Sequence, residues 1–164
     1  MAEGPTQPSS LVSSAGQLPL LRVCELLNAA GAHYLVCGAH ACILHGLVRT
    51  TEDVDILVEP TEENCLRVID ALGRMEDGAA RELTPQDILD NVVVKIADEV
   101  EVDVSTKAWQ VSYPDAAPQA REAVVDGIRI PFLGLDDLIA SKETYREQDA
   151  YDRMRLLALR EQQD

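Results

Sequence analysis

Residues 34–58 read YLVCGAHACILHGLVRTTEDVDILV, and the central part of the fold is predicted from this stretch. The apolar run at 34–37 predicts a short strand that ends at Gly38. Residues 39–44 predict a short helix, and a second strand is predicted over 53–59, directly before a proline. The stretch therefore predicts a strand, a tight turn, a short helix and a second strand.

Helices are predicted on both sides of this stretch. Apolar residues recur at helical spacing from Leu18, and Gly31 stands where a helix commonly ends. Thr61 precedes two acidic residues, which is typical of a helix start, and Gly73 marks the end of that helix. Residues 135–161 predict one or two closing helices.

Two hairpins are predicted in the second half of the chain. The β-branched runs 91–97 and 100–106 are separated by Asp-Glu. The runs 123–125 and 128–132 are separated by Asp-Gly, which is the stronger hairpin signal. The order of helices and strands predicts an α/β (α+β) fold, with a small mixed sheet flanked by helices.

The composition fits one folded domain. The 164 residues are 46% hydrophobic and 26% charged, which excludes a largely disordered chain. Residues 1–16 are rich in Ser, Pro and Gly, so we expect a disordered leader before a single domain at 17–164. No apolar run approaches the ~20 residues of a membrane-spanning helix. Four unevenly spaced cysteines without a signal-peptide pattern favour the cytoplasm.

The chain is strongly acidic. Its 14 Lys and Arg residues stand against 29 Asp and Glu residues, which gives a net charge of −15 at pH 7. This balance argues against broad, non-specific contact with nucleic acid, because the phosphate backbone is itself a polyanion. Nucleic-acid binding would require a local basic patch.

Three aspartates are candidates for a metal site. Asp53 and Asp55 lie two apart in a predicted strand, so their side chains leave the same face, with Cα atoms about 7 Å apart. Asp103 projects from one face of another predicted strand, and the three carboxylates converge if the strands are neighbours. All-oxygen ligation favours Mg²⁺ or Mn²⁺, and two such ions hold nucleotide phosphates for in-line displacement. The alternative, in a chain with 29 acidic residues, is a solvated face.

The opening stretch resembles the signature of the DNA polymerase β-type nucleotidyltransferase superfamily. That signature is an apolar strand, a Gly-Gly or Gly-Ser turn, a short helix and D-x-D on the next strand. His45-Gly46, Arg49 and Thr51 resemble the small bacterial branch that includes abortive-infection toxins and minimal nucleotidyltransferases. Residues 100–104 stand where the family carries its third carboxylate, and 131–152 resemble the closing helices of the branch. The resemblance covers nearly the whole predicted domain.

The resemblance implies a role for each motif. Asp53, Asp55 and Asp103 would hold Mg²⁺ or Mn²⁺, and Asp103 would also activate the acceptor hydroxyl. Gly38 and the backbone at Ala39 would approach the triphosphate, where a side chain would block access and helix amides point at phosphate. Ala39 departs from the usual Gly or Ser, so a serine hydroxyl contact to phosphate is missing.

Basic residues are implied for the phosphates. Lys142 and Arg146 are four apart on a predicted helix and share one face, and Arg49 is a third cation. Thr51 belongs to the same implied nucleotide-binding set. The alternative for Lys142 and Arg146 is an exposed helix whose cations pair with neighbouring acids. The Asp-x-x-Asp at 149–152 is expected to orient these cations rather than to bind metal.

The implied function is metal-dependent transfer of a nucleoside monophosphate from an NTP, such as ATP, to a hydroxyl acceptor, with release of pyrophosphate. The acidic charge favours a protein or small-molecule acceptor, and a cognate toxin or antitoxin would fit a toxin–antitoxin or phage-defence setting. A tRNA or other RNA acceptor would require one basic patch formed by Lys142, Arg146, Arg153 and Arg155. The alternative is an inactive binding module that neutralises a partner protein, which Ala39 and Gln148 favour.

Two further sets of residues have a functional and a structural interpretation. A zinc site is one interpretation of Cys37, His40, Cys42 and His45. Buried cysteines and packed histidines are the other. Trp109 and Tyr113 have rings that stack on a nucleobase, but in a chain with 4% aromatic residues we expect them to pack against the sheet.

Overall fold

The computed structural model describes residues 14–163, so the predicted leader lies outside the described residues except for 14–16, which begin the first helix. The helices are α1 (Ser14–Ala29), α2 (Gly38–Leu44), α3 (Glu62–Leu72), α4 (Pro85–Asp90), α5 (Tyr113–Ala116), α6 (Leu135–Ser141) and α7 (Glu147–Gln163), with 3-10 turns at Ala79–Glu82 and Ala117–Gln119. The strands are β1 (Tyr34–Cys37), β2 (Val54–Val58), β3 (Val94–Ala97), β4 (Glu101–Ser105), β5 (Lys107–Ala108), β6 (Val111–Ser112), β7 (Arg121–Val125) and β8 (Ile128–Phe132). Among the described helices, none is both long and apolar enough to cross a bilayer.

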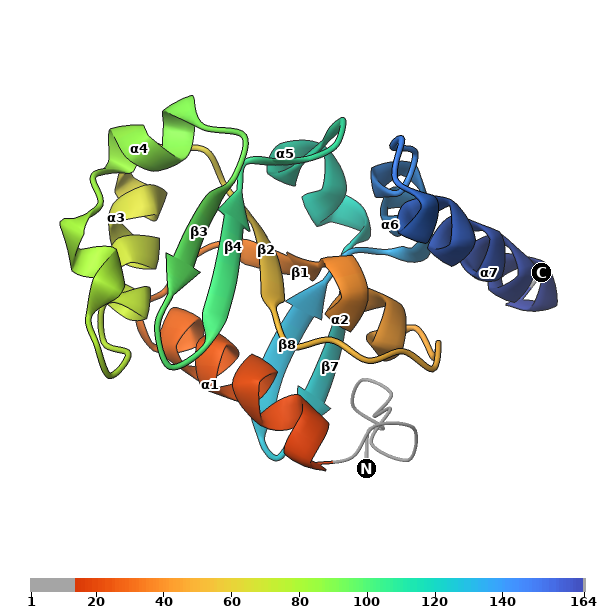
Figure 1. The fold of residues 1–164 in the computed structure, drawn as a ribbon, viewed down its shortest axis with the longest axis horizontal. Helices are drawn as coiled ribbons and strands as arrows, with labels where there is room; N and C mark the ends of the chain where they lie inside the picture. The colour runs from red at the N-terminus through yellow and green to blue at the C-terminus, as the bar shows by residue number, and fades with distance from the viewer. Residues whose placement is uncertain (1–13, 164) are drawn as a thin grey trace.

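Six strands form one mixed sheet in the order β3-β4-β2-β1-β8-β7 (Figure 1). β2 runs parallel to β4, and β1 runs parallel to β8, whereas the other neighbours are antiparallel. A separate small sheet pairs β5 with β6. The predicted α/β class with a small mixed sheet is confirmed.

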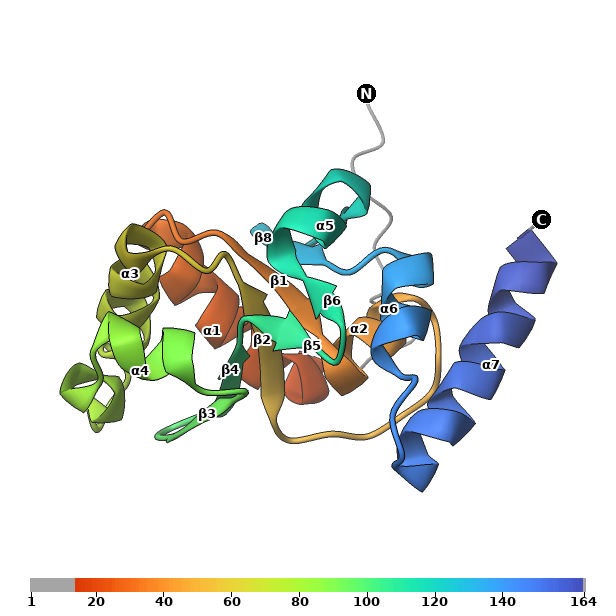
Figure 2. The ribbon, with the colours of Figure 1, turned by 90° about the horizontal axis from the view of Figure 1, so that it is seen from above.

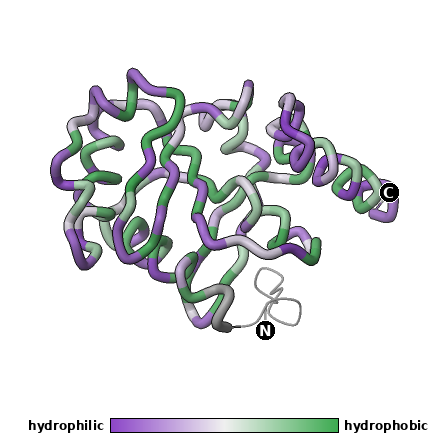
Figure 3. The backbone as a smooth tube through the Cα atoms, in the orientation of Figure 1, coloured by the Kyte–Doolittle hydropathy of each residue, from purple (hydrophilic) through white to green (hydrophobic). Residues whose placement is uncertain are grey.

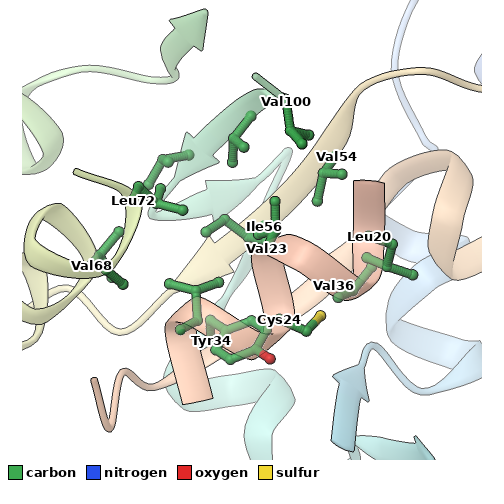
Figure 4. Packing of buried hydrophobic residues seen from close by; sticks show 14 of the residues in the cluster. Leu20, Val23, Cys24, Tyr34, Val36, Val54, Ile56, Val68, Leu72 and Val100 are labelled. Atoms are coloured by element: carbon green, nitrogen blue, oxygen red, sulfur yellow. The ribbon is translucent and has the colours of Figure 1, made fainter. Parts of the chain in front are cut away.

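Each face of the central sheet has its own hydrophobic layer. On one face, β2 contributes Val54 and Ile56 to a cluster with α1 and α3, and Figure 4 shows Val23 of α1 and Leu72 of α3 in that layer. On the other face, Leu57 packs with residues of α2, α6 and α7. Figure 3 maps hydropathy along the chain: all four residues of β1 are apolar and buried, and β2 ends in the apolar run Ile56–Val58. Because successive side chains of a strand point to opposite faces, these central strands contribute to both layers.

Both predicted hairpins are confirmed. β3 pairs with β4, and β7 pairs with β8. Asp126 and Gly127 have φ angles of 52° and 79°, so both occupy the left-handed region that this two-residue turn requires. The strand predicted over 91–97 is too long, because Asn91 forms the C-cap of α4 and the strand begins at Val94.

Helix α4 is an element that the sequence analysis missed, although its sequence carries a capping box. The Thr84 side chain accepts a hydrogen bond from the backbone N–H of Asp87, and the Asp87 carboxylate accepts one from the backbone N–H of Thr84. Pro85 stands at the first helical position, where it costs no hydrogen bond. Capping chemistry rather than apolar periodicity marks this short helix.

The closing region holds two helices, and the break between them changes one expectation. α6 ends at Ser141 with Lys142 as its C-cap, and Arg146 lies in the loop before α7. The prediction that Lys142 and Arg146 share a helix face is therefore wrong. The chain leaves the helix at Lys142, and its buried side chain contacts aspartates of α7 instead.

Buried Asn64 ties together the ends of three elements. Its Oδ1 accepts a hydrogen bond from the His33 N–H at 2.7 Å, and its Nδ2 donates to the carbonyl oxygens of His33 and Glu59 at 2.9 and 3.1 Å. Its own backbone N–H donates to the Thr61 hydroxyl at 3.1 Å. Asn64 therefore fixes the start of β1, the end of β2 and the start of α3 relative to one another.

We expect Asn64→Ala to lower the free energy of unfolding by about 2–3 kcal/mol, because three backbone groups lose their partner in a buried place. Thr61→Ala, which removes only the helix cap, should cost about 1 kcal/mol. Urea denaturation of both variants measures the difference. A loss for Asn64→Ala no larger than that for Thr61→Ala would contradict the bridging role.

Candidate active site

The parallel pairing of β2 with β4 sets Asp55 directly opposite Asp103. On the other side of β2, the antiparallel register with β1 sets Cys37 opposite Asp55. Asp53 stands one residue before β2, and all three aspartates line one pocket of about 610 Å³. The two strands are neighbours, which is the condition for the carboxylates to approach one another.

Because Gly38 has no side chain, the Asp55 carboxylate can lie against the backbone at this position. Its φ angle is +65°, and a Cβ placed on it would lie 2.1 Å from Asp55 Oδ2. Glycine is needed here both for the left-handed backbone and for the absence of a side chain. Ala39 follows in α2, is buried and lines the same pocket.

Asp55 is an electrostatically strained group. Burial, with the charge and the hydrogen bond of Asp103, raises the pKa of the Asp55 carboxyl to about 7. Lys142 acts in the opposite direction. Two neighbouring carboxylates ionise together only when positive charge lies close to them. The pair is therefore a place where a cation stabilises the protein.

Asp103 already contacts one cation, which the sequence analysis missed. Lys95 lies directly opposite Asp103 on β3, and its Nζ donates to Asp103 Oδ1 at 2.9 Å. The same Nζ is 3.6 Å from Glu101 Oε2. This hydrogen bond raises the pKa of the exposed Lys95 ammonium. The contact depends on the register of the β3–β4 hairpin, which the sequence signal does not specify.

The donor chemistry of the site fits a hard divalent cation. Within residues 14–163, no group of three or more His, Cys, Asp or Glu side chains is arranged to hold a metal ion. Asp55 and Asp103 nevertheless present adjacent carboxylate oxygens, whose mutual repulsion a cation relieves, and Asp53 offers further oxygen atoms to the same pocket. A metal ion would compete with Lys95 for Asp103.

The residues predicted to bind nucleotide line the same pocket. They come from the turn after β1, the loop before β2 and the loop before α7, and they are Gly38, Ala39, Arg49, Thr51, Lys142 and Arg146. Arg146 is exposed, whereas Lys142 is buried. The pocket therefore brings carboxylates and cations from distant parts of the sequence together.

Two aspartates of α7 hold Lys142 in place. Its Nζ lies 3.4 Å from Asp149 Oδ1 and 3.1 Å from Asp152 Oδ2. Arg49 Nη1 lies 3.3 Å from the same Asp152 oxygen, and the Thr144 hydroxyl donates to Asp149. The expectation that the Asp-x-x-Asp orients the cations agrees with these contacts.

Two of the four cations named for an RNA-binding patch are engaged within the fold. Lys142 is buried and paired, so it does not belong to an exposed patch. Arg155 donates to the Val48 carbonyl at 3.1 Å and lies over the Tyr151 ring, 5.4 Å from its centroid. These contacts direct the two cations to different partners.

Trp109 lines the pocket, and the expectation that it packs against the sheet is wrong. It stands in the turn between β5 and β6, is 42% exposed and meets Tyr145 edge-on. Tyr113, at the start of α5, is not among the residues that line this pocket. Tyr145 is a further pocket residue that the sequence analysis missed, because its loop has no periodic signal.

The zinc interpretation is not supported by the geometry, since no three of the candidate ligands converge within the described residues. His45 Nε2 lies 2.8 Å from the Leu133 carbonyl oxygen. His40 Nε2 has no hydrogen-bond partner in the described part of the chain, and burial lowers the pKa of His40 to about 4. Burial also raises the pKa of the Cys42 thiol, which identifies a packed cysteine.

Comparisons with known proteins match the fold rather than the sequence. No protein-family model matches the sequence, and no curated protein sequence does. Among solved structures, a candidate nucleotidyltransferase from Thermotoga maritima matches over 93% of this chain and 97% of its own, with 14% identity and a TM-score of 0.53. The fold is nucleotidyltransferase-like.

A second solved structure has the same fold. An antigenic nucleotidyltransferase-like protein from Paracoccidioides brasiliensis matches over 90% of this chain and 78% of its own, with 16% identity and a TM-score of 0.56. Both likenesses span the central sheet and its helices, since they cover nearly all of the chain. The nucleotidyltransferase-like fold is thus supported by two structures, while the toxin-related branch stays a prediction.

Gly38→Ala is expected to be more costly than the same change at Gly31. Both glycines have positive φ, so each alanine should cost about 1–2 kcal/mol through the backbone. At Gly31 nothing lies within 4 Å of the added Cβ, whereas at Gly38 it meets Asp55, which should add about 2 kcal/mol. Urea denaturation measures both losses, and equal losses would show that the pocket yields to the methyl group.

Asp55→Asn is expected to raise the melting temperature of metal-free protein by several degrees at pH 8. The folded pKa of Asp55 is raised, so the wild type loses stability as pH rises from about 4, the unfolded pKa, to about 7. Asparagine does not ionise and still offers a donor to Asp103.

Thermal unfolding in a chelator from pH 4 to 8 tests this expectation. The increase in melting temperature of Asp55→Asn over the wild type should shrink toward pH 4 and level off above about pH 7. Asp70→Asn, at an exposed position on α3, is the matched control and should show no such trend. A gain independent of pH would contradict the raised pKa.

Proposed function

We propose that this protein is a metal-dependent nucleotidyltransferase, which moves a nucleoside monophosphate from an NTP to a hydroxyl acceptor. The observation that carries the proposal is the register of β2 and β4, because it sets Asp55 beside Asp103 in a pocket that Gly38 keeps open. The same pocket holds Arg49, Lys142 and Arg146, which suits a ligand with several negative charges. The nucleotidyltransferase-like fold supports the proposal at the level of architecture.

The reaction follows from these groups. Asp53, Asp55 and Asp103 would hold Mg²⁺ or Mn²⁺, which when bound supplies positive charge to the phosphates and to the attacking oxygen. The acceptor oxygen forms a bond to the α-phosphorus, and the bond from that phosphorus to the leaving pyrophosphate breaks. Asp103 takes the proton of the acceptor hydroxyl. Lys95 donates to Asp103 Oδ1, so this oxygen takes the proton only after the lysine has moved away from it.

The cations of the pocket have different parts in binding. Lys142 is fixed by Asp149 and Asp152, so it presents a charge of constant position to the phosphates. Arg146 is exposed on the loop before α7 and approaches a ligand from solvent. Fixed charge near the reacting phosphate stabilises the charge that develops on the leaving pyrophosphate.

The acceptor we favour is a protein or a small molecule. The net charge of −15 repels a long polyanion, and the buried Lys142 does not join a surface patch for RNA. A cognate toxin or antitoxin modified on a hydroxyl side chain would fit such a surface. The rival function is a binding module without turnover, favoured by the lysine that occupies Asp103 and by Ala39.

Thermal shift with each NTP, with and without Mg²⁺ or Mn²⁺, tests the proposal. A ligand at 100 times its dissociation constant should stabilise the wild type by about 2.7 kcal/mol. The double variant Asp53→Asn/Asp55→Asn should lose the metal-dependent shift, because it loses two charged donors. The control Asp70→Asn/Asp77→Asn removes the same charge from exposed positions and should keep it.

Three results would contradict the proposal. No shift of the wild type with any NTP would remove the enzyme function. An NTP shift that needs no metal and survives in the double variant would favour the binding module. Loss of the shift in the exposed control pair would show that net charge, rather than the pocket, governs binding.

A further inference from the structure

The β5–β6 hairpin places the only tryptophan of the chain in the pocket of the aspartates. β5 pairs with β6 directly, which leaves Trp109 and Gln110 as a two-residue turn. Figure 2 shows this hairpin beside α6, and β5 also contacts β2, the strand that carries Asp55. The turn is thereby held next to the carboxylates by both of its neighbours.

Trp109 occupies the turn in an unfavourable backbone conformation. Its φ angle is 61°, in the left-handed region that two-residue hairpins normally fill with Gly or Asn. Burial of the side chain is incomplete, because 42% of the residue remains exposed. A bulky ring that is both strained and exposed at a pocket indicates a role in binding rather than in folding.

Tyr145 contacts the indole ring of Trp109. The two ring centroids lie 5.7 Å apart with an interplanar angle of 88°, so the rings meet edge to face. Tyr145 comes from the loop between α6 and α7 and is itself 94% exposed. Both rings therefore remain accessible to a flat ligand that enters the pocket.

Cations accompany both rings. Lys107 lies two residues before Trp109, and Arg146 directly follows Tyr145, and both line the same pocket. Within residues 14–163 neither cation forms an ion pair, unlike Lys142 and Arg49. Aromatic rings next to unpaired cations and paired carboxylates match a ligand with a flat ring, a polyphosphate and a bound metal ion.

We infer that Trp109, with Tyr145 beside it, is the platform on which the base of the nucleoside triphosphate stacks. The inference rests on the proposed function and adds the side chain that recognises the base. Stacking tolerates every base, because each has a π face, so all four NTPs are ligands of the same platform. Of the two aromatic residues considered from the sequence, the pocket contains Trp109 and not Tyr113.

The single tryptophan makes the test specific, because intrinsic indole fluorescence reports only this position. ATP with Mg²⁺ should quench the fluorescence of the wild type in a saturable way. Inorganic tripolyphosphate with Mg²⁺ carries the phosphates without a base, so it should bind with little quenching. Calorimetry on the same samples measures both affinities independently of fluorescence.

Variants of Trp109 distinguish the contribution of the base to binding from that of the phosphates. Trp109→Gly should weaken ATP binding about tenfold or more and leave tripolyphosphate binding unchanged. Trp109→Phe keeps an aromatic face and should restore most of the ATP affinity. The control Tyr151→Ala removes an exposed ring that lies over Arg155 on α7, and it should bind both ligands as the wild type does.

A stability readout excludes misfolding as the cause of weaker binding. Glycine suits the positive φ of this turn, which partly offsets the lost indole contacts, so unliganded Trp109→Gly should still unfold in one cooperative transition, and binding is compared at a temperature where both proteins are folded. ATP binding that is equally strong in Trp109→Gly, without quenching in the wild type, would overturn the inference and leave the proposed function standing. Equal losses for ATP and tripolyphosphate would also overturn it. No binding of either ligand by the wild type would overturn both proposals.

Discussion

The side-by-side placement of Asp55 and Asp103 is the constraint around which the rest of the structure is arranged. Parallel pairing of β2 and β4 puts the two carboxylates in register, where burial and the neighbouring charge of Asp103 raise the pKa of Asp55. The neighbouring backbone has no side chain at Gly38, because a Cβ there would collide with Asp55. Strained carboxylates of this kind cluster at functional sites rather than in structural cores.

The cations of the pocket are held by a second set of contacts, which helix α7 contributes. A buried ammonium needs partners, and Lys142 finds them in Asp149 and Asp152 of α7. Arg49 shares Asp152, so the loop before β2 is linked to the last helix. The chain has a net charge of −15, yet Lys142 and Arg49 stay at the pocket because aspartates of α7 pair with them.

Many of the helices and strands can be predicted from local patterns of residues in the sequence. Alternating apolar residues in β2, the threonine cap of α3 and the Asp-Gly turn between β7 and β8 each specify their own element. Helix α4, despite its capping box, and the β5–β6 hairpin were not predicted from the sequence. The first is too short for periodicity, and the second holds a tryptophan where turn chemistry favours glycine.

Local sequence patterns predicted most of the helices and strands, both hairpins of the central sheet and the three candidate aspartates. Each of these depends on neighbours within a few positions along the chain, and short-range spacing encodes them. The contact of Lys95 with Asp103, the burial of Lys142 against α7 and the position of Trp109 in the pocket depend on how the chain folds. These contacts depend on strand register and on loops that bring distant segments together, and no local pattern of residues specifies either.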